Sequence, residues 1–123
     1  VYMKIDNSSA IPIYEQIYKQ LLEYITTGLM QPEEKLPSVR ELSSDMHINP
    51  NTVVKAYRIL EQQGFIYSIP GKGSFVSSKQ NFQTELFTEQ INELIQEIVT
   101  KGKYIGISFE QLCDLIKQVW EEK

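Results

Sequence analysis

Hydrophobic residues recur at helical spacing in five stretches of the chain. The first stretch has an isoleucine or leucine at every fourth position: Ile13, Ile17, Leu21 and Ile25. Proline suits the first turn of a helix and glycine the position just beyond its end, so Pro12 and Gly28 fit the two limits. We therefore expect a helix over residues 12–27 that packs one apolar face into a core.

The second helical stretch follows a polar loop at residues 31–35. Ser38 with Glu41 three residues later is typical of a capping box, in which each side chain bonds the backbone N–H of the other residue. The apolar side chains that face inward are Val39, Leu42 and Met46. The short segment at residues 45–48 then predicts a turn.

A third helix is expected to start at Asn49 and Pro50, because asparagine is a favoured cap and proline costs no hydrogen bond at the next position. It ends near Gln63, where Gly64 suits a left-handed cap. At about 100° per residue, one face is apolar and the opposite face carries only amides and cations. The apolar face is Val53, Ala56, Tyr57 and Leu60, and the opposite face is Asn51, Lys55, Arg58 and Gln62.

A β-hairpin follows the third helix. β-Branched and aromatic residues at 65–69 and 75–76 predict two strands, with a Pro-Gly-Lys-Gly turn at 70–73 between them. Two helices joined by a turn and followed by a hairpin have the layout of a winged helix-turn-helix. We expect a mostly α-helical fold with a small β-hairpin.

The outward face of the third helix indicates DNA binding. In a helix-turn-helix the second helix enters the major groove, and its N-terminal residues reach base edges. The residues expected to select the sequence are Asn49, Asn51 and Thr52, and those expected to contact phosphates are Ser38, Arg40, Lys55 and Arg58. Each residue alone also fits a plain cap or a solvated surface, and only the set favours DNA.

The predicted hairpin tip places one cation between two glycines. Gly71 and Lys72 would form a slim tip that suits a sugar-phosphate backbone or the narrow minor groove. The same residues also fit an ordinary hairpin turn. They lack the spacing of a phosphate-binding P-loop, which precedes a helix.

The charge balance complicates a DNA-binding function. The chain has a net charge of −4, whereas DNA-binding domains usually have a basic excess. Residues 1–78 carry seven basic and eight acidic side chains, and residues 79–123 carry five and eight. Affinity for DNA must therefore come from the placement of a few cations, and a second copy of the chain would double them.

The sequence offers little for catalysis or metal binding. Cys113 alone forms no intrachain disulfide, and with His47 alone it cannot build a zinc site of the usual type. No nucleophile and base are placed together, so we expect no enzyme activity, no cofactor and no metal site. No apolar run is long enough for a membrane span and no signal peptide is evident, so we expect a cytoplasmic protein.

Three motifs together resemble the DNA-binding domain of the GntR family of bacterial transcriptional regulators: LPSVREL, NPNTVVKAYRILEQQGFI and GKGSFV. The resemblance covers residues 10–77 and implies a winged helix-turn-helix that binds palindromic operators as a dimer. It implies a backbone contact from Arg40. On the recognition helix and the wing tip the matching positions are Asn51, Thr52, Lys55, Gly71 and Lys72. Many members have a basic residue early in the recognition helix, which residues 49–51 lack, so base preference does not transfer.

The remaining residues resemble the tail of the short YtrA-like subgroup, which is two helices used for dimerisation. Residues 79–123 are too few for the ligand-binding or aminotransferase-like domains of other members. Members of the subgroup often control neighbouring transporter genes. We therefore expect a DNA-binding domain at residues 10–78 and a dimerisation segment at residues 79–123.

The apolar pattern of the tail also predicts two amphipathic helices. The first covers residues 83–105, and its apolar residues step by three or four. Gly102 within it either costs about 1 kcal/mol relative to alanine or lets another helix come close. Ser108 with Gln111 is a capping box for the second helix. The apolar stripe of that helix is Phe109, Leu112, Cys113, Ile116, Val119 and Trp120.

Two such helices cannot bury both apolar faces by themselves, so a partner chain is expected to cover them. The residues expected at that interface are Phe87, Ile91, Leu94, Ile98, Ile105, Leu112, Ile116 and Trp120. The alternative is that the pair packs onto the DNA-binding domain of its own chain.

The residues predict a sequence-specific DNA-binding regulator that acts as a homodimer. The resemblance implies in addition a repressor of a palindromic double-stranded operator and, as in many members of the subgroup, a neighbouring transporter operon as its target. The alternative is a winged-helix module that binds another protein, which the acidic balance would suit. Whether an effector binds between the two halves is left open, because so short a tail predicts no dedicated pocket.

Overall fold

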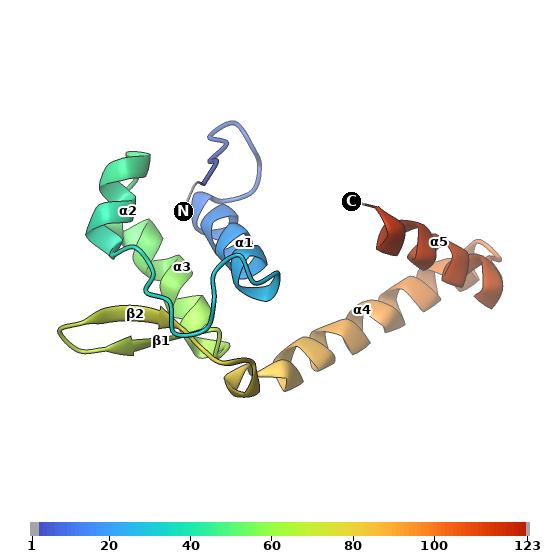
Figure 1. Cartoon of the computed structure of the whole chain (residues 1–123). Helices are drawn as coiled ribbons and strands as arrows, with labels where there is room; N and C mark the ends of the chain where they lie inside the picture. The colour runs from blue at the N-terminus through green and yellow to red at the C-terminus, as the bar shows by residue number, and fades with distance from the viewer. Residues whose placement is uncertain (1–2, 123) are drawn as a thin grey trace. The chain divides into compact units, whose positions relative to one another are not determined.

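The computed structural model describes residues 3–122, which divide after Thr84 into two compact units (Figure 1). The first unit holds α1 (Ile13–Thr26), α2 (Val39–Met46), α3 (Pro50–Gln62), β1 (Ile66–Ile69), β2 (Gly73–Val76) and a short 3-10 turn, η1 (Lys79–Asn81). The second unit is built from α4 (Thr84–Tyr104) and α5 (Phe109–Glu121). The predicted winged helix-turn-helix in a mostly helical chain is confirmed.

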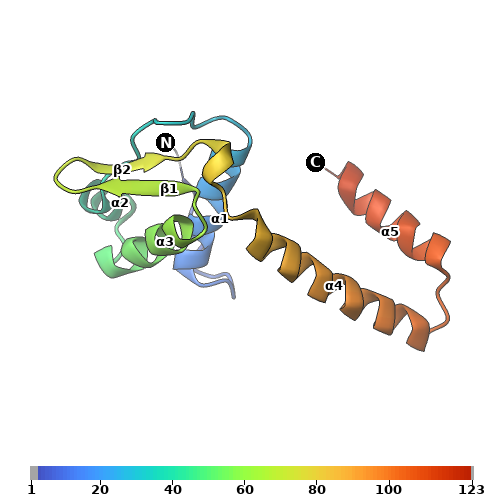
Figure 2. The same ribbon diagram turned by 90° about the horizontal axis from the view of Figure 1, so that it is seen from below.

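The core of the first unit lies between α1 and α3, which pack directly on each other. The apolar faces predicted from helical spacing are buried, with side chains from Ile17, Leu21, Ile25, Leu42, Val53, Ala56, Tyr57 and Leu60. Val39 and Met46 of α2 are half-buried. β1 packs against α3 (Figure 2), and Ile66 and Val76 of the hairpin complete the core.

α2 runs to Met46, so the turn is shorter than the one predicted at residues 45–48. His47 has left-handed backbone with φ 55°, and the N–H of Ile48 donates to the carbonyl of Ser43 over 3.0 Å. This is the bonding of a Schellman-type helix end. A histidine occupies the left-handed position that glycine usually marks, so no local sequence signal predicts this boundary.

A loop segment, residues 33–36, pairs with the free edge of the hairpin. β1 and β2 pair antiparallel, with the register Ile66–Val76, Tyr67–Phe75, Ser68–Ser74 and Ile69–Gly73. On the other side of β2, the Leu36 N–H donates to the Ser74 carbonyl over 2.8 Å, and the Val76 N–H donates to the Glu34 carbonyl over 2.9 Å. Residues 31–35 form the expected polar loop, and its second half also pairs with β2, which the sequence did not predict. Charged residues are common on edge strands, and they hid this pairing.

The segment after β2 returns to the C-terminal end of α3. Gly64 has a φ of +77°, as expected for a left-handed cap, and a Cβ atom there would collide with the carbonyl oxygen of Asn81. The N–H of Gln83 donates to the carbonyl of Gln63 over 2.8 Å. Residues 79–83 are thus docked on the C-terminal end of α3, which the sequence did not predict.

The tail forms the two predicted helices, and α4 ends at Tyr104, one residue earlier than expected. The capping box of α5 is confirmed, since the Gln111 N–H donates to the Ser108 Oγ over 3.1 Å and the Ser108 N–H to the Gln111 Oε1 over 2.9 Å. Gly102 is buried, and a Cβ there would lie 3.1 Å from Leu112 Cδ1. The glycine therefore lets α5 approach α4, which was one of its two expected roles.

Candidate nucleic-acid interface

The described residues contain no helix that is long and apolar enough to cross a membrane. In the same part of the chain, no three side chains of histidine, cysteine, aspartate or glutamate gather in a way that could hold a metal ion. The candidate site comprises the surface residues of α2, α3 and the hairpin that the sequence singles out.

The N-terminus of α3 presents amides to solvent. The Oδ1 of Asn49 accepts a hydrogen bond from the Asn51 N–H over 2.8 Å, so this oxygen caps the helix and the Asn49 Nδ2 group is left to donate. Asn51 is exposed and Thr52 is half-buried. The Asn51 side chain offers both the donor and the acceptor that a bidentate contact to adenine uses.

Two cations continue this surface along α3. Lys55 and Arg58 are exposed. The ammonium of Lys55 lies 3.9 Å from the centre of the Tyr14 ring. Among residues 3–122, the ion pairs join Lys19 to Glu15 within α1 and Lys101 to Glu97 within α4, so neither Lys55 nor Arg58 is paired with a carboxylate.

The start of α2 is fixed by a capping box and by a hydrogen bond to α3. The predicted capping box is confirmed, because the Ser38 Oγ accepts from the Glu41 N–H over 3.0 Å and the Ser38 N–H donates to Glu41 Oε1 over 3.3 Å. The Ser38 hydroxyl keeps its own hydrogen for a donor role. The buried Tyr57 hydroxyl donates to the Pro37 carbonyl over 2.6 Å, and burial raises the pKa of Tyr57. Arg40 lies exposed on the first turn of this anchored helix.

The hairpin tip is a tight turn. The N–H of Lys72 donates to the Ile69 carbonyl over 2.9 Å, and Gly71 has a φ of +78°. Proline followed by glycine with positive φ is typical of a type II turn. Gly71 and Lys72 are exposed, and a Cβ on Gly71 would meet nothing within 4 Å. The tip is therefore slim and cationic, as expected.

A second cation lies along the hairpin, and sequence reasoning missed it. Lys35 forms a bridge with Phe75 beside β2, and its side chain runs across Gly73. A Cβ on Gly73 would lie 2.9 Å from Lys35 Cε and 3.7 Å from its Nζ. The only signal in the sequence was a glycine on β2 next to the tip, and its meaning depends on the unexpected pairing of residues 33–36.

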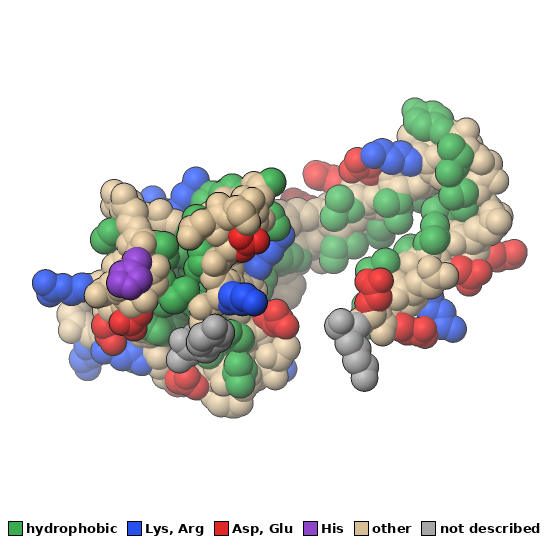
Figure 3. All heavy atoms as spheres, turned by 90° about the horizontal axis from the view of Figure 1, so that it is seen from above, with side chains coloured by type: hydrophobic (Ala, Val, Ile, Leu, Met, Phe, Trp, Pro, Cys, Tyr) green, Lys and Arg blue, Asp and Glu red, His purple; other side chains and the backbone are tan. Residues whose placement is uncertain are grey.

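The second unit has a large exposed apolar surface on α4 and α5 (Figure 3). Six of the residues predicted at a dimer interface are exposed: Ile91, Leu94, Ile98, Ile105, Ile116 and Trp120. Phe87 and Leu112 are half-buried. An open apolar groove of about 490 Å³ is lined by Ile98, Leu112, Leu115, Ile116, Val119 and Trp120. Trp120 is 85% exposed, which leaves a large aromatic ring without cover on its own unit.

Two known proteins resemble the chain over almost its whole length, and a third resembles it over 63%. The HTH-type transcriptional repressor YtrA of Bacillus subtilis is 40% identical over 95% of this chain and 91% of its own. The crystal structure of a transcriptional antiterminator from Listeria monocytogenes has a TM-score of 0.78 at 32% identity, over 98% of this chain and 91% of that one. The DNA-binding domain of AraR, solved in complex with operator ORR3, has a TM-score of 0.53 at 28% identity, over 63% of this chain and 93% of that one.

The family comparison covers the unit that carries the candidate interface. The model of the bacterial regulatory proteins of the gntR family matches residues 13–76, from the start of α1 to the end of β2. Those residues include every side chain placed above at the candidate interface. The winged helix-turn-helix and the full-length similarity to YtrA agree with this match. The chain thus belongs to the GntR family of bacterial regulatory proteins, among its short YtrA-like members.

Proposed function

We propose that the protein is a sequence-specific repressor that binds a palindromic DNA operator. The observation that carries this proposal is the exposed face of α3, which has amides at its N-terminus and cations further along. A recognition helix meets base edges and phosphates in that order. The Bacillus YtrA protein is named a repressor, and the AraR domain was solved on its operator, which supports the same activity here.

The repressor is proposed to act as a homodimer in the bacterial cytoplasm. The apolar surface of α4 and α5 would join two copies, and each copy would place one α3 in a major groove. Two-fold symmetry of the dimer then matches a palindromic site. Resemblance to the YtrA-like subgroup suggests a neighbouring transporter operon as the target.

Selection of duplexes from a random pool tests this function directly. We expect enrichment of one inverted repeat, with half-sites at a constant spacing of about one helical turn or more. The enriched duplex should shift the full chain in a gel, while an RNA of the same sequence should not compete. A pool that remains unselected at low salt would contradict the proposal.

A protein-interaction module is the second candidate. The net charge of −4 would suit it, since acidic proteins attract nucleic acid weakly. An interaction surface would show an apolar patch on the outward face of α3, whereas Asn51, Lys55, Arg58 and Gln62 are exposed there. The exposed face of α3 therefore favours DNA.

Replacement of Asn51 with alanine is expected to relax preference at one base pair of each half-site. A lost bidentate contact costs about 1–3 kcal/mol of discrimination against the wrong base. Binding to a panel of single-base variants of the selected operator measures the effect. Gln62→Ala, at the far end of the same helix, is the matched control and should leave the panel unchanged. If Asn51→Ala weakens every variant equally, Asn51 does not read a base.

Replacement of Lys72 with alanine is expected to weaken all DNA sequences about equally. The affinity for DNA falls as salt rises, and each lost phosphate contact makes the slope of log affinity against log salt less steep by about 0.9. A dimer loses two such contacts, so its slope should become less steep by about twice that. Titrations at several salt concentrations measure the slope. Lys79→Ala removes another exposed cation, outside the hairpin, and should keep the slope. An unchanged slope for Lys72→Ala would remove the hairpin tip from the interface.

A further inference from the structure

We propose that Tyr14 of α1 is a positioning residue for DNA binding, because its ring holds the ammonium of Lys55 at the edge of the recognition helix. The inference rests on the proposed DNA-binding function. The Lys55 Nζ lies 3.9 Å from the ring centre, which is within the range of a cation–π interaction. Tyr14 lies in the first turn of α1 and Lys55 in the second turn of α3, so the contact joins two elements.

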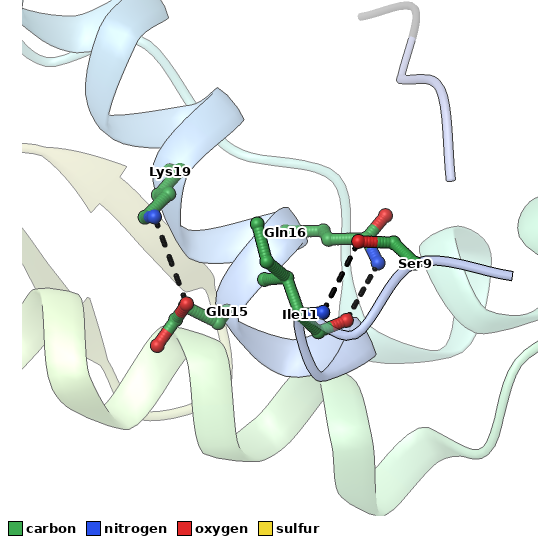
Figure 4. A network of polar contacts seen from close by, with 5 residues as sticks. All are labelled: Ser9, Ile11, Glu15, Gln16 and Lys19. Carbon is green, nitrogen blue, oxygen red and sulfur yellow. Dashed lines mark hydrogen bonds and ion pairs between the residues drawn. The ribbon is translucent and has the colours of Figure 1, made fainter. Parts of the chain in front are cut away.

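The first turn of α1, which carries Tyr14, is hydrogen-bonded to the chain before it. Figure 4 shows the contacts of Ile11 with Gln16 and with Ser9. The Gln16 Nε2 donates to the carbonyls of Ile11 and Asp6 over 2.8 and 3.0 Å. Its Oε1 accepts from the Asp6 N–H over 2.8 Å, and the Ile11 N–H donates to the Ser9 Oγ over 3.1 Å. Tyr14 itself is half-buried. The ring is therefore part of the folded unit and can orient a mobile partner.

Lys55 gains from such orientation because lysine is flexible. A free lysine on a helix surface samples many rotamers, and a phosphate contact must select one of them. The ring occupies one side of the ammonium and leaves N–H groups on the other side to donate. No acidic side chain of the described residues forms an ion pair with Lys55, so the ring is the contact that the structure gives its charge. Ordering by Tyr14 before DNA arrives would lower the entropy lost on binding.

Two other arrangements predict different effects of Tyr14 on DNA affinity. If the ring drew Lys55 away from the phosphate, loss of the ring would tighten DNA binding. If Tyr14 touched DNA by its own hydroxyl alone, loss of the ring would weaken binding whether or not Lys55 were present. A double-mutant cycle between the two residues separates these cases.

The experiment measures the affinity of the full chain for the duplex that it selects from a random pool. The variants are Tyr14→Leu, Lys55→Gln, both together, and Tyr14→Phe. An exposed cation–π contact corresponds to about a threefold effect at each half-site, hence about tenfold for a dimer. We expect Tyr14→Leu to weaken binding by that factor in the original chain and to have no effect beside Lys55→Gln. Tyr14→Phe keeps the ring and should bind as the original chain does.

The outcomes distinguish this inference from the proposed function. Equal losses from Tyr14→Leu with and without Lys55, or tighter binding, would overturn the positioning role while leaving the DNA-binding function intact. A chain that binds no duplex at all would overturn both. The contact can also be seen without DNA, because the Lys55 Cε protons should show an upfield ring-current shift in NMR spectra that Tyr14→Leu removes and Tyr14→Phe retains. Absence of that shift in the original chain would also contradict the inference.

Discussion

Replacement of Ile116 with aspartate is expected to make the protein monomeric and to weaken its binding to a two-half-site operator at least about a hundredfold, because a dimer holds its second half-site intramolecularly. Ile116 is 50% exposed and lines the apolar groove between α4 and α5. A carboxylate buried there without a partner would oppose association strongly. Analytical ultracentrifugation gives the oligomeric state, and titration of operator and single half-site duplexes gives the two affinities.

The control for this prediction lies on the same helix. Gln118→Asp adds the same charge two residues further along α5, outside the residues that line the groove, and should leave both oligomeric state and affinity unchanged. Circular dichroism checks that α5 stays folded in each variant. A monomeric Ile116→Asp chain that keeps full operator affinity would show that dimerisation is unnecessary for binding. A chain that remains dimeric would place the interface elsewhere.

The size of this effect follows from the weak charge of the DNA-binding motif. Residues 36–76 carry four basic and three acidic side chains. Phosphate contacts supply most non-specific affinity for DNA, so one copy has little to offer by electrostatics. Lys35 lies just outside residues 36–76 in the sequence but alongside the hairpin in the structure. It adds one cation there, and the sequence did not predict this position. Even so, a second copy is the larger gain, because it doubles cations and base contacts together.

Local signals explain which elements could be predicted from the sequence. The capping boxes at Ser38 and Ser108 each depend on a partner three residues away, and both form in the structure as predicted. The apolar face of α3 follows from helical spacing in the same way, and its four predicted residues are buried. Such features depend only on residues that are close in the sequence, so they can be predicted before the fold is known.

Contacts between distant residues explain what was missed. The pairing of Leu36 with Ser74, the path of Lys35 over Gly73, and the ring contact between Tyr14 and Lys55 each join segments that are far apart in sequence. Neither hydrophobic periodicity nor a capping motif predicts a contact between residues that are far apart in sequence. The candidate site was therefore predictable along α3, where one helix supplies it, and incomplete at its edges, where α1 and the loop segment beside β2 contribute.

The docking of residues 79–83 is the missed contact with the clearest consequence for stability. Replacement of Gly64 with alanine is expected to cost about 3 kcal/mol of unfolding free energy, since left-handed backbone penalises a side chain by about 1–2 kcal/mol and the added Cβ must also displace a packed segment. The displaced segment would lose the hydrogen bond from Gln83 to Gln63 and the contact between the Phe65 and Phe82 rings, whose centres lie 4.5 Å apart. Urea unfolding measures the change.

A matched variant at Gly71 separates the backbone penalty from the loss of docking. The φ of Gly71 is +78°, close to the +77° of Gly64, but a Cβ on Gly71 would meet nothing within 4 Å. Gly71→Ala should therefore cost only the backbone penalty of about 1–2 kcal/mol. The excess loss in Gly64→Ala then measures the docking of residues 79–83 against α3. Trypsin should also cleave Gly64→Ala faster after Lys79, since that residue lies in η1, within the segment that would be released. Equal losses in the two variants would mean that the segment contributes nothing to stability and that the C-terminal end of α3 is independent of the chain leading to α4.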